Sequence, residues 1–186
     1  MEIIWKHEDT DMEVTQGAPF ESFGLSEATM RAIRNKHYTV STPVQAGCIP
    51  PMLAGKDVIA KAPTGTGKTM AFGIPIIERI DPESEAVQAV ILAPTRELAS
   101  QIADTCMPIG KHTRHFIGTF VGGVSYDPQI RKLERGLDVA IATPGRLIDL
   151  MERGAIDLNS VEVLVLDEAD RMLDMGFWPQ VERIVN

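Results

Sequence analysis

The sequence predicts an α/β domain of the doubly wound type, with a parallel β-sheet core and helices on both faces. Five short apolar runs recur along the 186 residues, each followed by a glycine-rich turn, a helical segment or a pair of acids. The runs are continuously apolar, which is typical of parallel strands that are buried on both faces. Strands that alternate with helices favour right-handed crossovers and a parallel sheet. Ligands of such sheets bind beyond the carboxyl ends of the strands.

Two helices are expected before the first apolar run. Residues 26–36 carry an apolar stripe with helical spacing, and Ser26 supplies a capping hydroxyl. In the second helix a threonine cap precedes Pro43, a residue that suits the first helical position. This helix should extend to about Leu53 and stop at Gly55.

The five apolar runs predict the strands of the sheet. They span residues 57–62, 87–93, 115–121, 138–143 and 161–166. The first leads through a glycine-rich turn into a helix that should reach about Arg79. Helices are also expected from about Thr95, after the second run, and over 144–153, after the fourth.

Composition narrows the class of protein. The formal net charge of −8 argues against a protein that coats nucleic acid through bulk electrostatics, but it allows a local basic groove. Cys48 and Cys106 are far apart and outside any CxxC motif, which excludes a disulfide framework and a cysteine zinc site. We therefore expect a reducing compartment and a cytoplasmic protein. No apolar run reaches the roughly 18–20 residues that span a bilayer, so no membrane partner is expected.

The chain begins with an acidic segment. Residues 1–18 are polar and aperiodic, so we expect a flexible lead-in before a single domain over 19–186. Five acids in the first twenty residues, with no apolar stretch after them, argue against a secretory signal.

Residues 62–69, Ala-Pro-Thr-Gly-Thr-Gly-Lys-Thr, match the phosphate-binding loop pattern, except that Ala62 occupies the position of its first glycine. The glycines let backbone N–H groups point inward at phosphate oxygens. Lys68 adds a charge for the β- and γ-phosphates, and the Thr69 hydroxyl can ligate Mg²⁺. The alternative is a glycine-rich turn without a ligand. The residues predicted to bind the nucleotide phosphates are Thr64, Gly65, Thr66, Gly67, Lys68 and Thr69.

Two acids follow the last apolar run. Asp167 has the place of the strand-end acid that holds Mg²⁺ in phosphate-loop enzymes, so we predict it as a metal ligand together with Thr69. Glu168 is then placed to orient or deprotonate the attacking water as a general base. The alternative is that Asp-Glu-Ala-Asp merely caps the next helix. The predicted catalytic residues are Lys68, Thr69, Asp167 and Glu168.

These motifs, together with residues 94–99 (Pro-Thr-Arg-Glu-Leu-Ala), Gly122-Gly123 and residues 143–146 (Thr-Pro-Gly-Arg), resemble the first RecA-like domain of a DEAD-box ATP-dependent RNA helicase. The resemblance covers about 20–186. It implies a RecA-like P-loop NTPase fold, ATP and Mg²⁺ as cofactors, and RNA-stimulated ATP hydrolysis coupled to local duplex unwinding or RNP remodelling. The family's Ser-Ala-Thr motif and its second RecA-like domain, which supplies arginine fingers, are not among these residues. We therefore expect this chain to bind nucleotide but to be a poor ATPase.

The resemblance also assigns the adenine site. Residues 42–45, Thr-Pro-Val-Gln, match the family's Q motif, in which Gln45 reads the adenine edge. A Gln amide offers a donor and an acceptor in one plane, which suits that edge. An upstream aromatic residue, here Phe20, is implied to stack on the ring; Phe23 is its rival, and both are alternatively core anchors.

Three further positions stand out against the family pattern. His37 occupies a place where glycine is typical, and Ser41 one where proline is typical. Asp170, the last residue of Asp-Glu-Ala-Asp, is implied to take part in coupling between the two domains.

The RNA contacts implied by the resemblance lie in three turns. Arginine forks can bind phosphate bidentately, and threonine caps at helix starts place free amides near an anion. Nothing in the set reads base edges, so RNA binding should be independent of sequence. Each turn taken alone is also a generic strand-to-helix connection. The set comprises Pro94, Thr95, Arg96, Gly122, Gly123, Thr143, Pro144, Gly145 and Arg146.

Two other functions remain open for the intact protein. One is another P-loop ATPase, such as a DNA translocase; the other is an ATP-gated RNA clamp without chemistry. Loss of the preference for ATP over GTP in Gln45→Ala favours the helicase over the first. Loss of activity in Glu168→Gln favours it over the second.

Overall fold

The computed structural model describes residues 3–5 and 10–186 and divides into two compact units. The first unit holds Met1–Arg79 and Pro108–Thr113, and the second holds Ile80–Met107 and Arg114–Asn186. None of the described helices combines the length and the apolar character that a membrane span requires.

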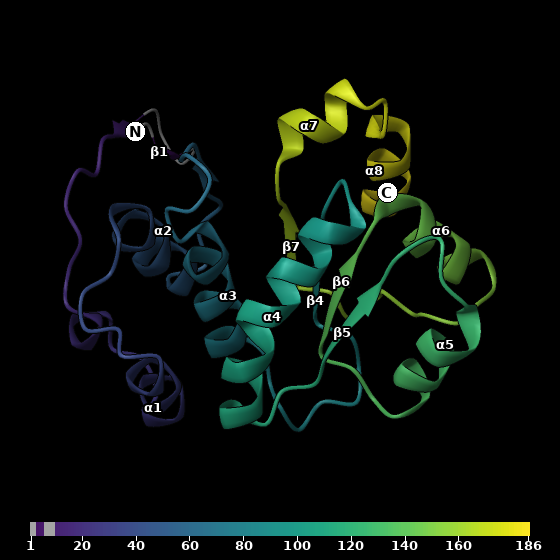
Figure 1. The fold of residues 1–186 in the computed structure, drawn as a ribbon, viewed down its shortest axis with the longest axis horizontal. Helices are drawn as coiled ribbons and strands as arrows, with labels where there is room; N and C mark the ends of the chain where they lie inside the picture. The colour runs from purple at the N-terminus through teal and green to yellow at the C-terminus, as the bar shows by residue number, and fades with distance from the viewer. Residues whose placement is uncertain (1–2, 6–9) are drawn as a thin grey trace. The chain divides into compact units, whose positions relative to one another are not determined.

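The second unit is built on a four-stranded parallel sheet in the order β5-β6-β4-β7 (Figure 1). The registers pair Leu92 with Ala142 and with Leu166, so that the strands end at one common edge. The two middle strands are buried throughout, as expected of parallel strands covered on both faces. Four of the five predicted strands are thereby confirmed. Their bounds are β4 Ala89–Leu92, β5 Ile117–Phe120, β6 Val139–Ala142 and β7 Val163–Leu166.

Helices follow these strands. Val90, Leu92, Ala140 and Ala142 turn one face of the sheet toward a core to which α5, α6, α7 and α8 contribute. The predicted helices from about Thr95 and over 144–153 are present. The short helices α5 and α8 were not predicted from the sequence, and α7 was considered only as the helix that follows Asp-Glu-Ala-Asp. The bounds are α4 Arg96–Thr113, α5 Tyr126–Glu134, α6 Pro144–Glu152, α7 Ala169–Asp174 and α8 Trp178–Val185.

The first unit holds the two helices predicted near the N-terminus. The hydroxyl of Ser26 accepts the N–H of Thr29, and Thr42 forms a capping box with Gln45, so both caps are confirmed. Gly55 follows the second helix with φ of 79°, in the left-handed region that favours glycine. The elements are η1 Phe20–Phe23, α1 Glu27–Asn35, α2 Pro43–Leu53 and α3 Lys68–Arg79.

The first apolar run does not form the strand that the sequence predicted. Within 57–62 only β3, Ile59–Ala60, is extended, and it pairs antiparallel with β1, Ile3–Trp5. Ile59 is half exposed, whereas we expected a buried strand of the parallel sheet. The physical reason is that an apolar run specifies extended backbone but not its pairing partner, which comes from elsewhere in the chain.

Part of the segment 1–18, which we expected to be a flexible lead-in, is also paired. β1 pairs with β2, Thr10–Met12, so two segments of this region form strands in a sheet of order β2-β1-β3. Residues 1–2 and 6–9 lie outside the described residues. Short segments like these carry little periodicity, so their pairing is not visible from sequence.

Ser41 contributes contacts that proline lacks. Its backbone N–H donates to the Ala18 carbonyl at 2.8 Å, and its hydroxyl accepts the Ala18 N–H at 2.9 Å. The side chain is buried. Since proline has neither N–H nor hydroxyl, serine at this position fastens the segment before η1 to the segment before α2.

His37 ends α1 in the left-handed conformation, with φ of 58°. Its N–H donates to Arg34 and that of Tyr38 to Ile33, the two bonds of a Schellman ending. His37→Gly is expected to raise the free energy of unfolding by roughly 0.5–1 kcal/mol, because glycine adopts this conformation without the Cβ penalty. Urea unfolding of the chain measures the change. His37→Ala is the control; if it stabilises equally, the backbone explanation is wrong.

Candidate functional site

The phosphate loop, residues 62–69, precedes α3 in the first unit. Gly65 and Gly67 have φ of 80° and 89°, which allows the loop to curl back before the helix begins at Lys68. Their backbone N–H groups donate to no other group among the described residues. Thr66 closes the curl from within, since its hydroxyl donates to the Pro63 carbonyl at 2.6 Å. Free amides and a helix N-terminus together form a cradle that suits an anion.

Gln45 joins the predicted adenine site to this loop. Its Oε1 accepts the Thr42 N–H at 2.9 Å, and its Nε2 donates to the Gly67 carbonyl at 3.1 Å. The side chain is 5% exposed. Each half of a primary amide can make a second hydrogen bond, so one donor and one acceptor remain beyond these contacts. The reading of adenine by Gln45 stays a prediction.

Phe20 is a buried residue in this structure, and its stacking on adenine stays a prediction. The ring is 1% exposed and packs edge-on against Phe23, with centroids 5.9 Å apart. The core-anchor alternative therefore describes Phe20 in this structure, because the segment before α1 folds the ring inward, with the Phe20 N–H donating to Thr39. Phe23 is half-buried.

The acidic motif follows β7 in the second unit. Asp167 is 9% exposed, and its Oδ1 accepts the Glu168 N–H at 3.1 Å. Glu168 has φ of 51° and ψ of 49°, a left-handed conformation that is costly for a residue with a Cβ. Its carboxylate pairs with Arg171 at 3.1 Å. Glu168 occupies the N-cap position of α7 without a side-chain capping bond.

Asp170 lies exposed in the first turn of α7. Its Oδ1 accepts the N–H of Arg171 at 2.9 Å, a local contact within the turn. Its predicted part in coupling two domains stays a prediction.

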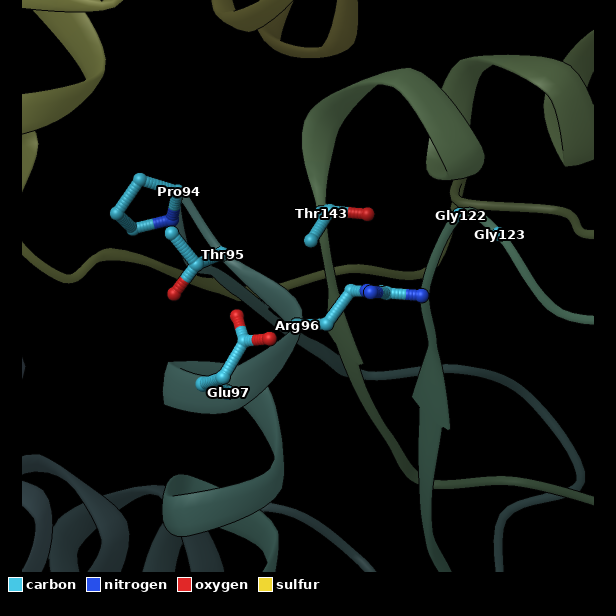
Figure 2. Close-up of a pocket in the computed structure, with 7 residues that line it drawn as sticks. All are labelled: Pro94, Thr95, Arg96, Glu97, Gly122, Gly123 and Thr143. Carbon is cyan, nitrogen blue, oxygen red and sulfur yellow. The ribbon is translucent and has the colours of Figure 1, made fainter.

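A pocket of about 510 Å³ lies at the carboxyl edge of the parallel sheet (Figure 2). Turns after three neighbouring strands, β4, β5 and β6, supply its walls, because parallel strands in register end at the same edge. Glu97 lines the pocket but was not among the predicted site residues. Its position directly after Arg96, within the motif at 94–99, is the sequence signal that could have found it. The lining residues are Pro94, Thr95, Arg96, Glu97, Gly122, Gly123 and Thr143.

Local contacts arrange this pocket. The Thr95 hydroxyl accepts the Leu98 N–H at 3.2 Å and so caps α4. Thr143 has the N-cap position of α6 but makes no capping bond with its side chain, which Figure 2 shows directed into the pocket. A Cβ on Gly123 would lie 2.6 Å from Nη1 of Arg96, so the glycine makes room for that guanidinium. Arg96 extends toward Gly122 and Gly123 (Figure 2).

Arg146 is buried in this structure, and the bidentate phosphate contact expected of it stays a prediction. The side chain is 7% exposed, and Nη2 donates to the Val124 carbonyl at 3.0 Å. Its remaining surface stacks on Tyr126. The physical reason is that Arg146 lies in the first turn of α6 on the side that packs on α5, whereas the neighbouring Gly145 is exposed and Pro144 is buried.

The donor set fits a magnesium ion that is bound together with phosphate. The described residues contain no cluster of three His, Cys, Asp or Glu side chains that could hold a metal. Mg²⁺ in phosphate-transfer sites is held by one or two protein oxygens plus phosphate and water. One carboxylate at Asp167 and one hydroxyl at Thr69 match that demand in chemistry. The two residues belong to different units, and their pairing stays a prediction.

Two buried groups, the Cys48 thiol and the Asp138 carboxyl, have shifted pKa values. Burial raises the pKa of the Cys48 thiol to about 11, so this thiol stays protonated at neutral pH. Burial also raises the pKa of Asp138, whose Oδ2 accepts the Phe116 N–H at 2.7 Å. Asp138 directly precedes β6, at the amino edge of the sheet, away from the pocket edge.

A phosphate loop, a strand-end acid pair and a parallel α/β sheet together define a nucleotide-binding domain of the P-loop class. The profile of one family, described as DEAD/DEAH box helicase, matches residues 42–186. The chain belongs to the DEAD/DEAH box helicase family, and it is an N-terminal RecA-like domain of that family.

Named relatives agree with this assignment. The chain is 46% identical over 167 residues to the DEAD-box ATP-dependent RNA helicase CshA of Bacillus subtilis, covering 90% of this chain and 34% of the relative. It is 48% identical over 183 residues to the ATP-dependent RNA helicase RhlB of Pseudomonas syringae, covering 94% and 46%. The crystal structure of a DEAD box protein from Methanococcus jannaschii has a TM-score of 0.85 at 40% identity and covers 90% and 46%. The chain thus spans a third to a half of the length of these relatives.

Proposed function

We propose that this chain is the ATP-binding core of an RNA helicase. In the whole protein, RNA would stimulate ATP hydrolysis, and hydrolysis would be coupled to local separation of an RNA duplex or to RNP remodelling. The observation that carries the proposal is the phosphate loop, with its unpartnered amides and its contact to Gln45. The names of the relatives, which are ATP-dependent RNA helicases, support RNA as the partner.

The roles of the nucleotide site follow from its chemistry. The loop amides and the Lys68 ammonium bind the β- and γ-phosphates. Thr69 and Asp167 supply oxygens for Mg²⁺, which when bound offsets the charge of the phosphates. Glu168 accepts a proton from the attacking water and is held in place by Arg171. Gln45 reads the adenine edge with the donor and acceptor that the loop leaves unused.

The pocket at the carboxyl edge is the proposed RNA site. The amides of Gly122 and Gly123, the Thr143 hydroxyl and the Arg96 guanidinium can all bind phosphate oxygens of one strand. Pro94, Thr95, Pro144 and Gly145 shape the two helix starts that border it. Since no group in the pocket is aimed at base edges, binding should not depend on sequence.

Two further parts of the proposal concern the whole protein. A second RecA-like domain in cis would complete the ATP site, so the 186-residue chain should bind nucleotide yet turn over ATP very slowly. We also propose a cytoplasmic location, because neither buried cysteine forms a disulfide.

Titration calorimetry with ADP and Mg²⁺ tests the nucleotide site in the chain itself. The native chain should bind, and Lys68→Ala should bind about thirtyfold more weakly, since it loses one charge-assisted contact to phosphate. Lys56→Ala, which removes the same charge from an exposed position, is the control and should bind normally. No heat for the native chain, or the same heat for Lys68→Ala, would contradict the proposal.

A further inference from the structure

Tyr126, the first residue of α5, lies between two arginines. The Cζ atoms of Arg146 and Arg153 are 3.9 and 4.2 Å from the centroid of its ring. Two guanidinium groups this close to one centroid cannot share a face of the ring, so they stack on opposite faces. The Tyr126 hydroxyl donates to Oδ2 of Asp149 at 2.7 Å. All three partners lie on α6 or directly after it, at a spacing that places them on one side of the helix.

The ring is the main partner of the buried Arg146 guanidinium. Nε and Nη1 of Arg146 are buried and have no hydrogen-bond partner among the described residues. A buried cation is costly unless it is paired, and an aromatic face supplies part of what water would. Within the described part of the chain, the guanidinium makes one hydrogen bond, from Nη2 to the carbonyl of Val124. The Tyr126 ring therefore packs against the guanidinium that holds the Val124 carbonyl.

Gln129 of α5 binds both ends of the same loop, residues 121–125. Its Oε1 accepts the Val121 N–H at 3.1 Å, and its Nε2 donates to the carbonyls of Val121 and Ser125 at 3.3 and 3.0 Å. Carbonyl groups of the loop are thus bound from the side of α5 and α6. The N–H groups of Gly122 and Gly123 donate to nothing within the described part of the chain. They are left for a ligand in the pocket that these glycines line.

We propose that Tyr126 is a positioning residue for RNA binding, and that Arg146 acts through the Val124 carbonyl and not as a ligand of phosphate. The stacked cluster of Tyr126, Arg146, Asp149 and Arg153 fixes loop 121–125 to the start of α6. The glycine amides and Thr143 then face one RNA strand as a preformed pair of contacts. This inference rests on the proposed RNA-helicase function.

The test uses the full-length protein and a 20-nucleotide single-stranded RNA in an ATPase assay. Tyr126→Leu should raise the RNA concentration for half-maximal stimulation about tenfold, as expected when a desolvated cation–π stack is lost. Its kcat at saturating RNA should stay within about twofold of the native value, because the loop does not touch the reacting phosphates. Tyr126→Phe keeps the stack and should rescue most of the RNA affinity.

Arg153→Ala provides a second measurement that does not disturb the core, since Arg153 is exposed. It should weaken RNA binding about threefold with an unchanged slope of log affinity against log salt concentration. A slope reduced by about 0.7 would mean that Arg153 binds a phosphate itself, and the inference would be wrong.

The outcomes separate the two proposals. If the native protein shows no RNA stimulation, the proposed function fails. If the native protein is stimulated, but Tyr126→Leu binds ADP and RNA as the native protein does, the proposed function stands and the positioning role is overturned. If Tyr126→Leu does not fold, Arg153→Ala decides the matter through its RNA affinity and its salt slope.

Discussion

Glu168→Gln in the full-length protein is expected to lower kcat for RNA-stimulated ATP hydrolysis by about 10²–10⁴-fold, the range that general-base catalysis supplies. The substitution keeps the size of the side chain and an oxygen that can accept from Arg171, but it removes the proton acceptor. Glutamine, like glutamate, has to adopt the left-handed backbone with φ of 51° at this position, so the substitution adds no new backbone strain and the site should stay intact. Steady-state ATPase rates at saturating RNA measure the loss, and ADP affinity should remain within about twofold of native because no ground-state contact to phosphate is lost.

The control for this prediction is Glu162→Gln. Glu162 directly precedes β7 and is exposed. Its replacement by glutamine removes the same negative charge as Glu168→Gln does. Its kcat should match that of the native protein. If Glu168→Gln keeps more than about a tenth of the native kcat, the chemistry assigned to Glu168 is wrong.

Gly67→Ala is expected to destabilise the chain by about 3 kcal/mol and to weaken ADP binding by about a hundredfold. An alanine Cβ would lie 2.5 Å from Nε2 of Gln45 and would sit on backbone with φ of 89°. The Gln45 amide would have to move and would lose its bond to the Gly67 carbonyl. Because Gln45 is buried, its displaced amide would be left without a partner. Urea unfolding and ADP calorimetry measure the two effects.

Gly65→Ala is a matched control in the same loop. Gly65 has φ of 80°, but a Cβ there would meet no atom within 4 Å. It should therefore carry only the backbone cost, roughly 1–2 kcal/mol. Equal effects of the two substitutions would show that the Gln45 contact contributes nothing to the loop.

The features that the sequence predicted correctly depend on residues close to one another in the chain. Ser26 and Thr42 cap their helices through residues three positions away. Gly65 and Gly67 take the left-handed backbone that their place in the phosphate loop requires. The apolar runs at 87–93 and 138–143 form buried parallel strands, as a continuous apolar run predicts.

Where the sequence left a residue's surroundings open, the deciding contacts join distant positions. Phe20 is buried, although it was expected to stack on adenine. Arg146, which was expected to bind phosphate, donates to a carbonyl 22 residues earlier in the chain. β3 pairs with the N-terminal strand β1, a partner that the sequence does not specify. In each case the residue type suits both the expected role and the observed one.

The sequence alone therefore predicted the helix starts, the loop glycines, the strand-end acids and the order of the motifs. Each of these features depends on neighbours within a few positions. Burial and pairing required the folded chain. Whether an aromatic ring faces a ligand or the core, and whether a guanidinium meets phosphate or a tyrosine, depends on which distant segments pack against it, and packing free energy is shared among many residues that no local pattern records.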